Sequence, residues 1–176
     1  MGIQGYDCRG CGQHHDELPF SYWAEAPAFW DEFATDDHST LGPEHCIIAG
    51  EQFFLRARLV IPVNDAATVE GTPAEFDWGV WVSLSERNYE RTTQLWETPG
   101  RESEPPYFGW MCTELPLYQP STLGLKTNLH TRPVGQRPIV ELEPTDHPLA
   151  VDYREGMTIE RAIALVQPFL ERVDRG

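Results

Sequence analysis

The chain has 176 residues with 28 acidic and 13 basic side chains, which gives a formal net charge of −15. This length and a hydrophobic content of 40% favour one folded domain over residues 1–176 and exclude a disordered chain. The negative charge repels a phosphate backbone and so argues against nucleic acid as a partner, and no apolar run approaches the roughly 18 to 20 residues that cross a membrane.

The first half of the chain mostly predicts strands. Residues 6–19 predict a short strand with a tight turn, and residues 27–34 predict a short helix. Residues 46–63 predict two strands, the second of which alternates apolar residues with arginines. Residues 76–85 are apolar on both faces, which is typical of a central strand.

The second half adds two helices and three strands. Ser85 has the side chain of a helix N-cap, and the helix after it ends before Pro99. Further strands are expected at 107–115, 123–132 and 138–144, and a carboxy-terminal helix is expected at 158–173. Strands that run together with helices outside them predict an α+β fold, with an antiparallel or mixed sheet and helices on one face.

Charge is segregated along the chain. Residues 1–51 hold ten acidic side chains and a single basic one, Arg9. The stretch between Glu114 and Glu141 holds no acid, and it carries Lys126, His130, Arg132 and Arg137. The sequence therefore predicts an acidic surface from the first third of the chain and a cationic one from the later stretch.

Two of the four cysteines form a close pair. Cys8 and Cys11 are separated by two residues, a spacing that lets both sulfurs bind one tetrahedral metal ion. Gly10 and Gly12 permit the tight turn that such a site needs. Because no export signal precedes the pair, disulfides are not expected, and residues 6–19 predict a metal knuckle with structural zinc as its cofactor.

A lone CxxC motif leaves two metal ligands to be found elsewhere in the chain. The candidates are cysteines and histidines outside the pair, namely His14, His15, His45, Cys46, Cys112, His130 and His147. We expect His15 and Cys46 to complete the site, and we interpret Cys112 as a core thiol. Two other interpretations stay open, a reversible redox pair formed by Cys8 and Cys11, and a reduced pair without metal.

A second candidate site lies in the acid-free stretch. Lys126, Asn128, His130 and Arg132 alternate along a predicted strand and therefore share one face. A face with two cations is costly to bury, so it is either solvated or binds an anion. His147, which follows an aspartate, joins this set as a ligand-binding candidate. No motif for a nucleophile or a phosphate-binding glycine loop occurs, so the sequence does not indicate an enzyme.

Five motifs follow one another along the chain: CRGCGQHHDELP, FDWGVWVSLSE, GRESEPPYFGWMC, LKTNLHTRP and ELEPTDHPLA. Together they resemble an uncharacterised bacterial family, domain of unknown function 2199, from the CxxC pair to the last helix. The resemblance implies a bacterial cytoplasmic protein and brings no established activity. His14 and His45 depart from the family pattern, which leaves a preferred ligand set of Cys8, Cys11, His15 and Cys46.

The leading interpretation is a non-enzymatic binding or regulatory module. In it the zinc knuckle pins the domain, and the acidic surface binds a basic protein partner, as small acidic immunity proteins do. The alternative is an enzyme or a binder of a small anionic ligand that uses His130, Arg132 and His147. A redox protein using the cysteine pair is a third interpretation. Neither a membrane nor nucleic acid is expected as a partner, and the expected location is the cytoplasm.

Overall fold

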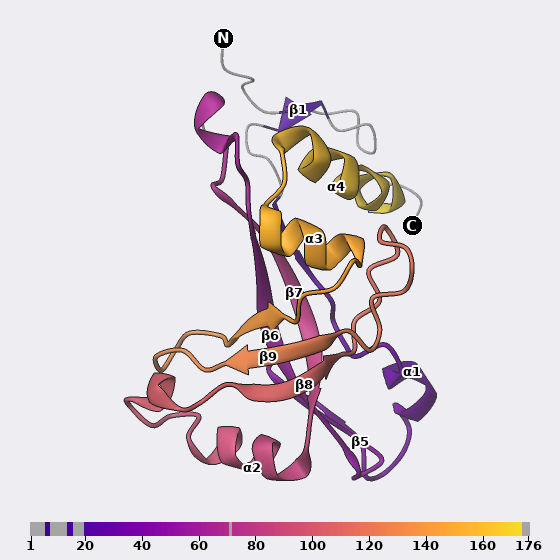
Figure 1. The fold of residues 1–176 in the computed structure, drawn as a ribbon. Coiled ribbons are helices and arrows are strands. Elements are labelled where there is room, and N and C mark those ends of the chain that lie inside the picture. The colour runs from indigo at the N-terminus through magenta and orange to yellow at the C-terminus, as the bar shows by residue number, and fades with distance from the viewer. Residues whose placement is uncertain (1–5, 8–13, 16–19, 71, 174–176) are drawn as a thin grey trace.

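The fold is built on a closed barrel of five strands (Figure 1). The computed structural model describes residues 6–7, 14–15, 20–70 and 72–173. The barrel strands are β6 (Gln52–Pro62), β7 (Glu75–Leu84), β8 (Tyr107–Met111), β9 (Lys126–His130) and β10 (Ile139–Leu142). Neighbours along the chain pair antiparallel, and a parallel pairing of β10 with β6 closes the ring.

The long β6–β7 hairpin forms the spine of the molecule because its sequence suits burial. In β6 the side chains of Leu55, Ala57 and Leu59 are fully buried, while the arginines that alternate with them are partly exposed. Every residue from Phe76 to Val82 is buried, so the prediction of a central strand is confirmed. The hairpin thus contributes side chains to two hydrophobic cores, one inside the barrel and one on its outer side.

Short strands extend the hairpin beyond the barrel. β3 (Ser21–Trp23) pairs parallel with β7, and β5 (His45–Ile48) and β4 (Thr40–Leu41) follow β6 on the other side. β1 (Tyr6–Asp7) and β2 (His14–His15) pair with each other. The predicted mixed sheet is therefore confirmed, but β3 and β4 are too short for the sequence pattern to show them.

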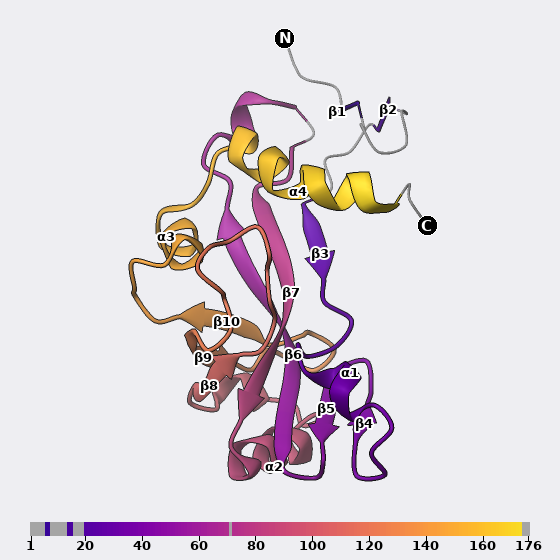
Figure 2. The ribbon, with the colours of Figure 1, turned by 90° about the vertical axis from the view of Figure 1, so that its right-hand side faces the viewer.

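Helices lie at both ends of the barrel, and the prediction of helices on one face does not describe this arrangement. α2 (Glu86–Gln94) lies at one end, whereas α3 (Pro148–Glu155) and α4 (Ile159–Val173) lie at the other (Figures 1 and 2). The short helix α1 (Trp30–Phe33) lies beside β5. A closed barrel offers no open flat face to a layer of helices, which explains the difference.

The predicted helix starts at Ser85 and Thr158 are found in the structure. Ser85 Oγ accepts a hydrogen bond from Asn88 N, and Thr158 Oγ accepts one from Arg161 N. None of the described helices is both long and apolar enough to span a lipid bilayer.

A second, smaller core lies outside the barrel. Cys46, Ile48, Phe54 and Trp81 are almost completely buried there, and Trp30 of α1 packs against them. Because α1 and the segment before β5 cover this side of the hairpin, apolar residues on both faces of β7 are protected from water.

Candidate anion-binding site

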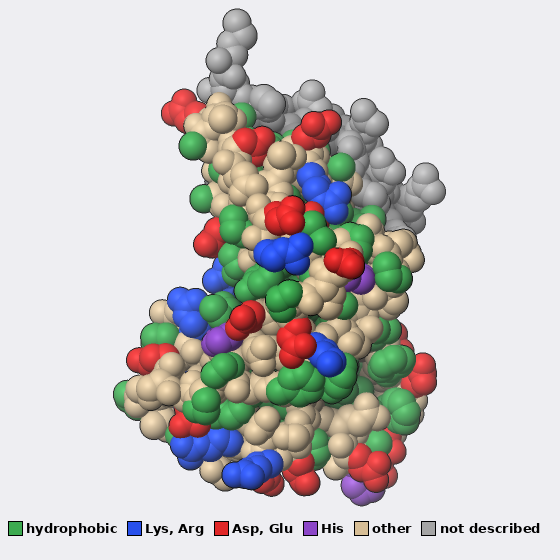
Figure 3. Space-filling model, in the orientation of Figure 1, with side chains coloured by type: hydrophobic (Ala, Val, Ile, Leu, Met, Phe, Trp, Pro, Cys, Tyr) green, Lys and Arg blue, Asp and Glu red, His purple; other side chains and the backbone are tan. Residues whose placement is uncertain are grey.

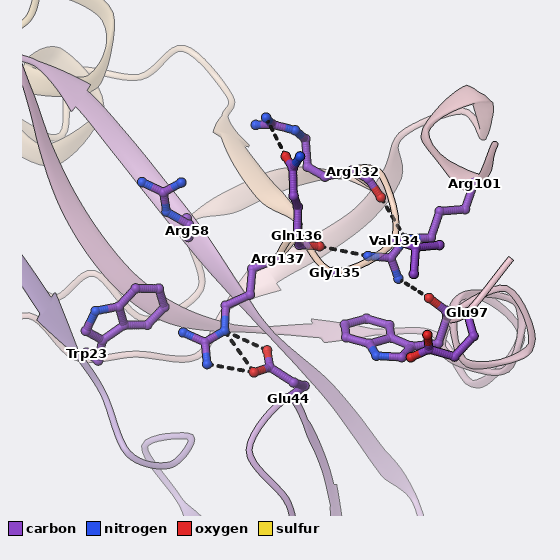
Figure 4. Close-up of a pocket in the computed structure, with 11 residues that line it drawn as sticks. Trp23, Glu44, Arg58, Glu97, Arg101, Arg132, Val134, Gly135, Gln136 and Arg137 are labelled. Atoms are coloured by element: carbon purple, nitrogen blue, oxygen red, sulfur yellow. Dashed lines mark hydrogen bonds and ion pairs between the residues drawn. The ribbon is translucent and has the colours of Figure 1, made fainter. Parts of the chain in front are cut away.

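A cleft of about 660 Å³ lies where the β9–β10 loop faces the β3 and β6 strands (Figure 4). Its lining contains four arginines and two glutamates, although the whole chain has a net charge of −15. The lining residues are Trp23, Glu44, Arg58, Trp96, Glu97, Arg101, Arg132, Val134, Gly135, Gln136 and Arg137. Cationic side chains from distant parts of the sequence therefore meet at one place.

Trp23 occupies its position in the cleft because Gly79 has no side chain. The two residues are partners in the β3–β7 pairing, and a Cβ atom on Gly79 would lie 2.0 Å from the Trp23 ring. The ring therefore lies directly against the β7 backbone. The guanidinium carbon of Arg137 lies 4.4 Å from the ring centroid and that of Arg56 lies 5.4 Å from it. Trp23 thus orients these arginines.

Arg137 is held by a two-pronged ion pair with Glu44. Its Nε donates to both carboxylate oxygens at 2.7 and 2.9 Å, and its Nη2 donates to Oε1 at 2.6 Å. These hydrogen bonds, together with the charge of Glu44, raise the pKa of Arg137 above its ordinary value. Among the described contacts, this pairing leaves Nη1 of Arg137 as the nitrogen that can donate to a ligand.

Arg58 is held by an ion pair with the buried carboxylate of Asp77. Its Nε donates to Oδ2 of Asp77 at 2.7 Å, and Asp77 is 7% exposed. Burial raises the pKa of Asp77, and the hydrogen bond and charge of Arg58 oppose that rise. Among the described residues no hydrogen bond engages either Nη of Arg58, so its terminal edge is available to a ligand.

Arg101 builds the wall of the cleft and is 3% exposed. Its guanidinium donates to four backbone carbonyl oxygens, those of Trp96, Arg132, Pro133 and Gln136, at 2.6 to 3.3 Å. Three of these carbonyls belong to the β9–β10 loop, so Arg101 pulls the loop backbone inward (Figure 4). Arg132, Val134 and Gln136 of that loop line the cleft.

Arg132 lies on the same loop, just after the end of β9. Its Nη2 donates to Oε1 of Gln136 at 2.9 Å, and its remaining donors have no protein partner within the described part of the chain. Figure 4 shows the two side chains meeting above the cleft. Arg132 is therefore oriented by a neutral partner and keeps its full charge for a ligand.

The predicted ligand-binding residues lie in different places, and Arg132 alone of the four lines the cleft. The predicted alternation on β9 is found, since Lys126, Asn128 and His130 are more exposed than the residues that separate them. Lys126 lies over Trp110 at 6.0 Å, and His130 pairs with Glu141 at 2.7 Å. Both thus belong to the outer surface of the barrel.

His147 has a structural position at the start of α3. Its Nδ1 accepts a hydrogen bond from Leu149 N at 3.1 Å, and its Nε2 donates to the carbonyl of Pro120 at 2.8 Å. The residue is 9% exposed. Both ring nitrogens are therefore occupied by the fold.

The structure does not bring the predicted metal ligands Cys46 and His15 together. Cys46 is fully buried in β5, where burial raises the pKa of its thiol to about 11. β2, which carries His15, lies at the opposite end of the molecule (Figure 2). Cys8 and Cys11 lie outside the described residues, and among those that are described no group of three or more metal-binding side chains occurs.

Sequence reasoning missed most of the cleft. Trp23, Glu44 and Arg58 were not candidates, and Arg137 was noted only as part of the acid-free stretch. One signal was present, because arginines alternating with buried residues in β6 must point out of the barrel. Nothing local to Trp23 or Glu44 indicates which distant arginine each will contact.

A search of curated proteins and a search of solved structures each found no match. The family described as an uncharacterized protein conserved in bacteria, domain of unknown function 2199, matches residues 7–157. That range contains every residue that lines the cleft. The chain therefore belongs to the family of domain of unknown function 2199.

Proposed function

We propose that the protein binds a small anionic ligand in the arginine cleft, as a non-enzymatic binding or regulatory module. The observation that carries this proposal is the convergence of Arg58, Arg132 and Arg137 from two separate parts of the chain. Each is already anchored by a protein acceptor, and each keeps a donor edge that no described residue engages. Guanidinium groups fixed in this way bind carboxylate or phosphate with little loss of side-chain entropy.

The tryptophans of the cleft support an ionic ligand over a flat aromatic one. One side of Trp23 lies against Gly79, and Arg137 lies over the ring at 4.4 Å. Trp96 has Arg101 at 4.7 Å and the ring of His45 at 4.5 Å. Because protein groups already contact these rings, the cleft offers charged edges more than it offers stacking surfaces.

Arg132→Ala is expected to weaken anion binding about tenfold or more, because it removes a charge-assisted contact and no buried partner. Isothermal titration with inorganic phosphate and with citrate, at constant ionic strength, measures the loss. Thermal melting without ligand should change little, since within the described part of the chain the Arg132 side chain bonds to exposed Gln136 alone.

Arg154→Ala is the matched control for that experiment. Arg154 is exposed on α3 and pairs with Glu155 at 3.2 Å, so its removal changes the net charge equally without touching the cleft. Equal losses of affinity in the two variants would show a general charge effect and contradict the proposal.

An acidic surface supports a second candidate function, binding of a basic protein partner. The described residues 20–55 include no lysine or arginine, and Asp31, Glu32, Asp36 and Asp37 are all exposed there. Figure 3 shows acidic side chains gathered at the lower right, over α1 and its surroundings. A surface of one sign speeds association with a partner of the opposite sign.

This candidate predicts a complex that weakens steeply with salt. A pull-down from the native host at low salt, repeated with Asp36 and Asp37 changed to asparagine, is expected to lose the partner in the variant. Recovery of the same protein by both forms would place the contact elsewhere.

We also retain structural zinc as a proposal for the pair Cys8 and Cys11. Metal analysis of untagged protein is expected to find about one zinc per chain, which a Cys8→Ser variant loses. Cys46→Ser should keep the metal, because Cys46 is fully buried in an apolar cluster. Metal-free protein with both thiols titrating freely would refute the zinc proposal.

A further inference from the structure

Arg58 and Arg132 belong to different walls of the cleft. Arg58 rises from β6 and also lines a neighbouring hollow of about 560 Å³ beside Phe20 and Glu75. Arg132 lies on the β9–β10 loop and does not line that hollow. Figure 4 shows the two guanidinium groups on separate supports, each with its terminal nitrogens directed away from the strand or loop that carries it.

The anchor of each arginine limits how far it can move toward the other. Arg58 could leave its position only by breaking the 2.7 Å contact with Asp77, which would leave a buried carboxylate without its counter-charge. One oxygen of Asp77 already lacks a hydrogen-bond partner within the described structure, so the loss would be severe. Arg132 is held more weakly, by Gln136.

The third arginine does not require an anionic group of its own. Arg137 donates through both Nε and Nη2 to Glu44, whereas Arg58 donates through Nε alone to Asp77. Among the described contacts, the larger sets of unengaged donors are therefore those of Arg58 and Arg132, one on each wall. A ligand with an anionic group at each end can satisfy both sets at once.

We propose that the natural ligand carries two anionic groups on one small molecule, one bound by Arg58 and the other by Arg132. This inference rests on the proposed function and specifies its ligand as a two-headed anion, such as a dicarboxylate or a linear polyphosphate. The second head converts two weak contacts into one bivalent interaction, whose strength depends on the span of the molecule.

Two series of probes test the inference at constant ionic strength. The first compares acetate with succinate, glutarate and adipate, and the second compares phosphate with pyrophosphate and tripolyphosphate. In at least one series we expect a two-headed member to bind about tenfold or more tighter than its one-headed parent, with an optimum length. The series that shows the gain distinguishes carboxylate from phosphate chemistry.

Single variants separate the two ends of the site. Arg132→Ala and Arg58→Lys are each expected to reduce the affinity of the best two-headed probe to about that of the one-headed parent. Lysine at position 58 keeps a positive charge beside Asp77, so the variant retains the buried pair while losing the terminal fork. Arg154→Ala should leave both affinities unchanged.

These measurements distinguish failure of the two-headed ligand from failure of the anion site. Equal affinities of one-headed and two-headed probes, with binding still lost in Arg132→Ala, would overturn the two-headed ligand and leave the anion site standing. A length optimum that Arg58→Lys does not alter would also overturn it. Failure of every probe to bind would remove the proposed function together with this inference.

Discussion

Arg101→Met is expected to lower the free energy of unfolding by about 3 to 5 kcal/mol, because it leaves the partly buried carbonyl oxygens of Trp96, Arg132 and Gln136 without the donor that Arg101 supplies. Methionine fills a similar length without replacing the four hydrogen bonds to the backbone. Urea denaturation followed by circular dichroism measures the change. Arg154→Met, at an exposed position on α3, is the matched control and should shift stability by less than about 0.5 kcal/mol.

The same variant is also expected to lose anion binding, although every donor that Arg101 directs at the loop is used within the protein. Without it the loop carbonyls are no longer drawn inward, and Arg132 loses its fixed position on that loop. Titration well below the melting temperature separates this effect from unfolding. Normal affinity in a destabilised but folded protein would show that Arg101 supports stability alone.

Gly79→Ala is expected to displace Trp23 from the cleft. The added Cβ would lie 2.0 Å from one ring carbon and 2.4 Å from another, so the ring cannot stay where it is. Crowding of this kind costs about 1 to 3 kcal/mol of stability. Anion affinity should fall as well, because Arg137 and Arg56 lose the ring that orients them.

A double variant identifies the cause of that effect. If the clash with Trp23 is responsible, Trp23→Ala combined with Gly79→Ala should be more stable than the sum of the two single losses predicts. Gly42→Ala is the control, since its nearest contact for a new Cβ is the His45 carbonyl at 3.4 Å. Strict additivity of the two losses would contradict the geometric explanation.

Individual strands and helix starts could be predicted where the residues that determine burial or capping lie close together in the sequence. The alternation in β6, the apolar faces of β7, and the caps at Ser85 and Thr158 all follow from residues close together in the sequence. Closure of the barrel does not follow from residues that are close together in the sequence. It depends on the pairing of Ile139 with Arg58, and no periodicity within either strand specifies that partner.

The candidate site was harder to predict because charge pairs form across the fold. Arg132 was recognised from its place in an acid-free stretch, but that reasoning also selected His130, which pairs with Glu141. Conversely, Arg58 looked like an ordinary exposed position on an amphipathic strand. Its significance comes from Asp77, whose burial is decided by the packing of β3 and β7.

Barrel closure also has a consequence for how the chain folds. The β9–β10 loop cannot face β6 until β10 has paired with β6, and this pairing joins segments far apart in the sequence. Contacts of such long range generally form late in folding, because the loop-closure entropy must be offset first. The cleft therefore requires the β10–β6 pairing, so a ligand that binds there stabilises the closed barrel over forms in which this pairing is open.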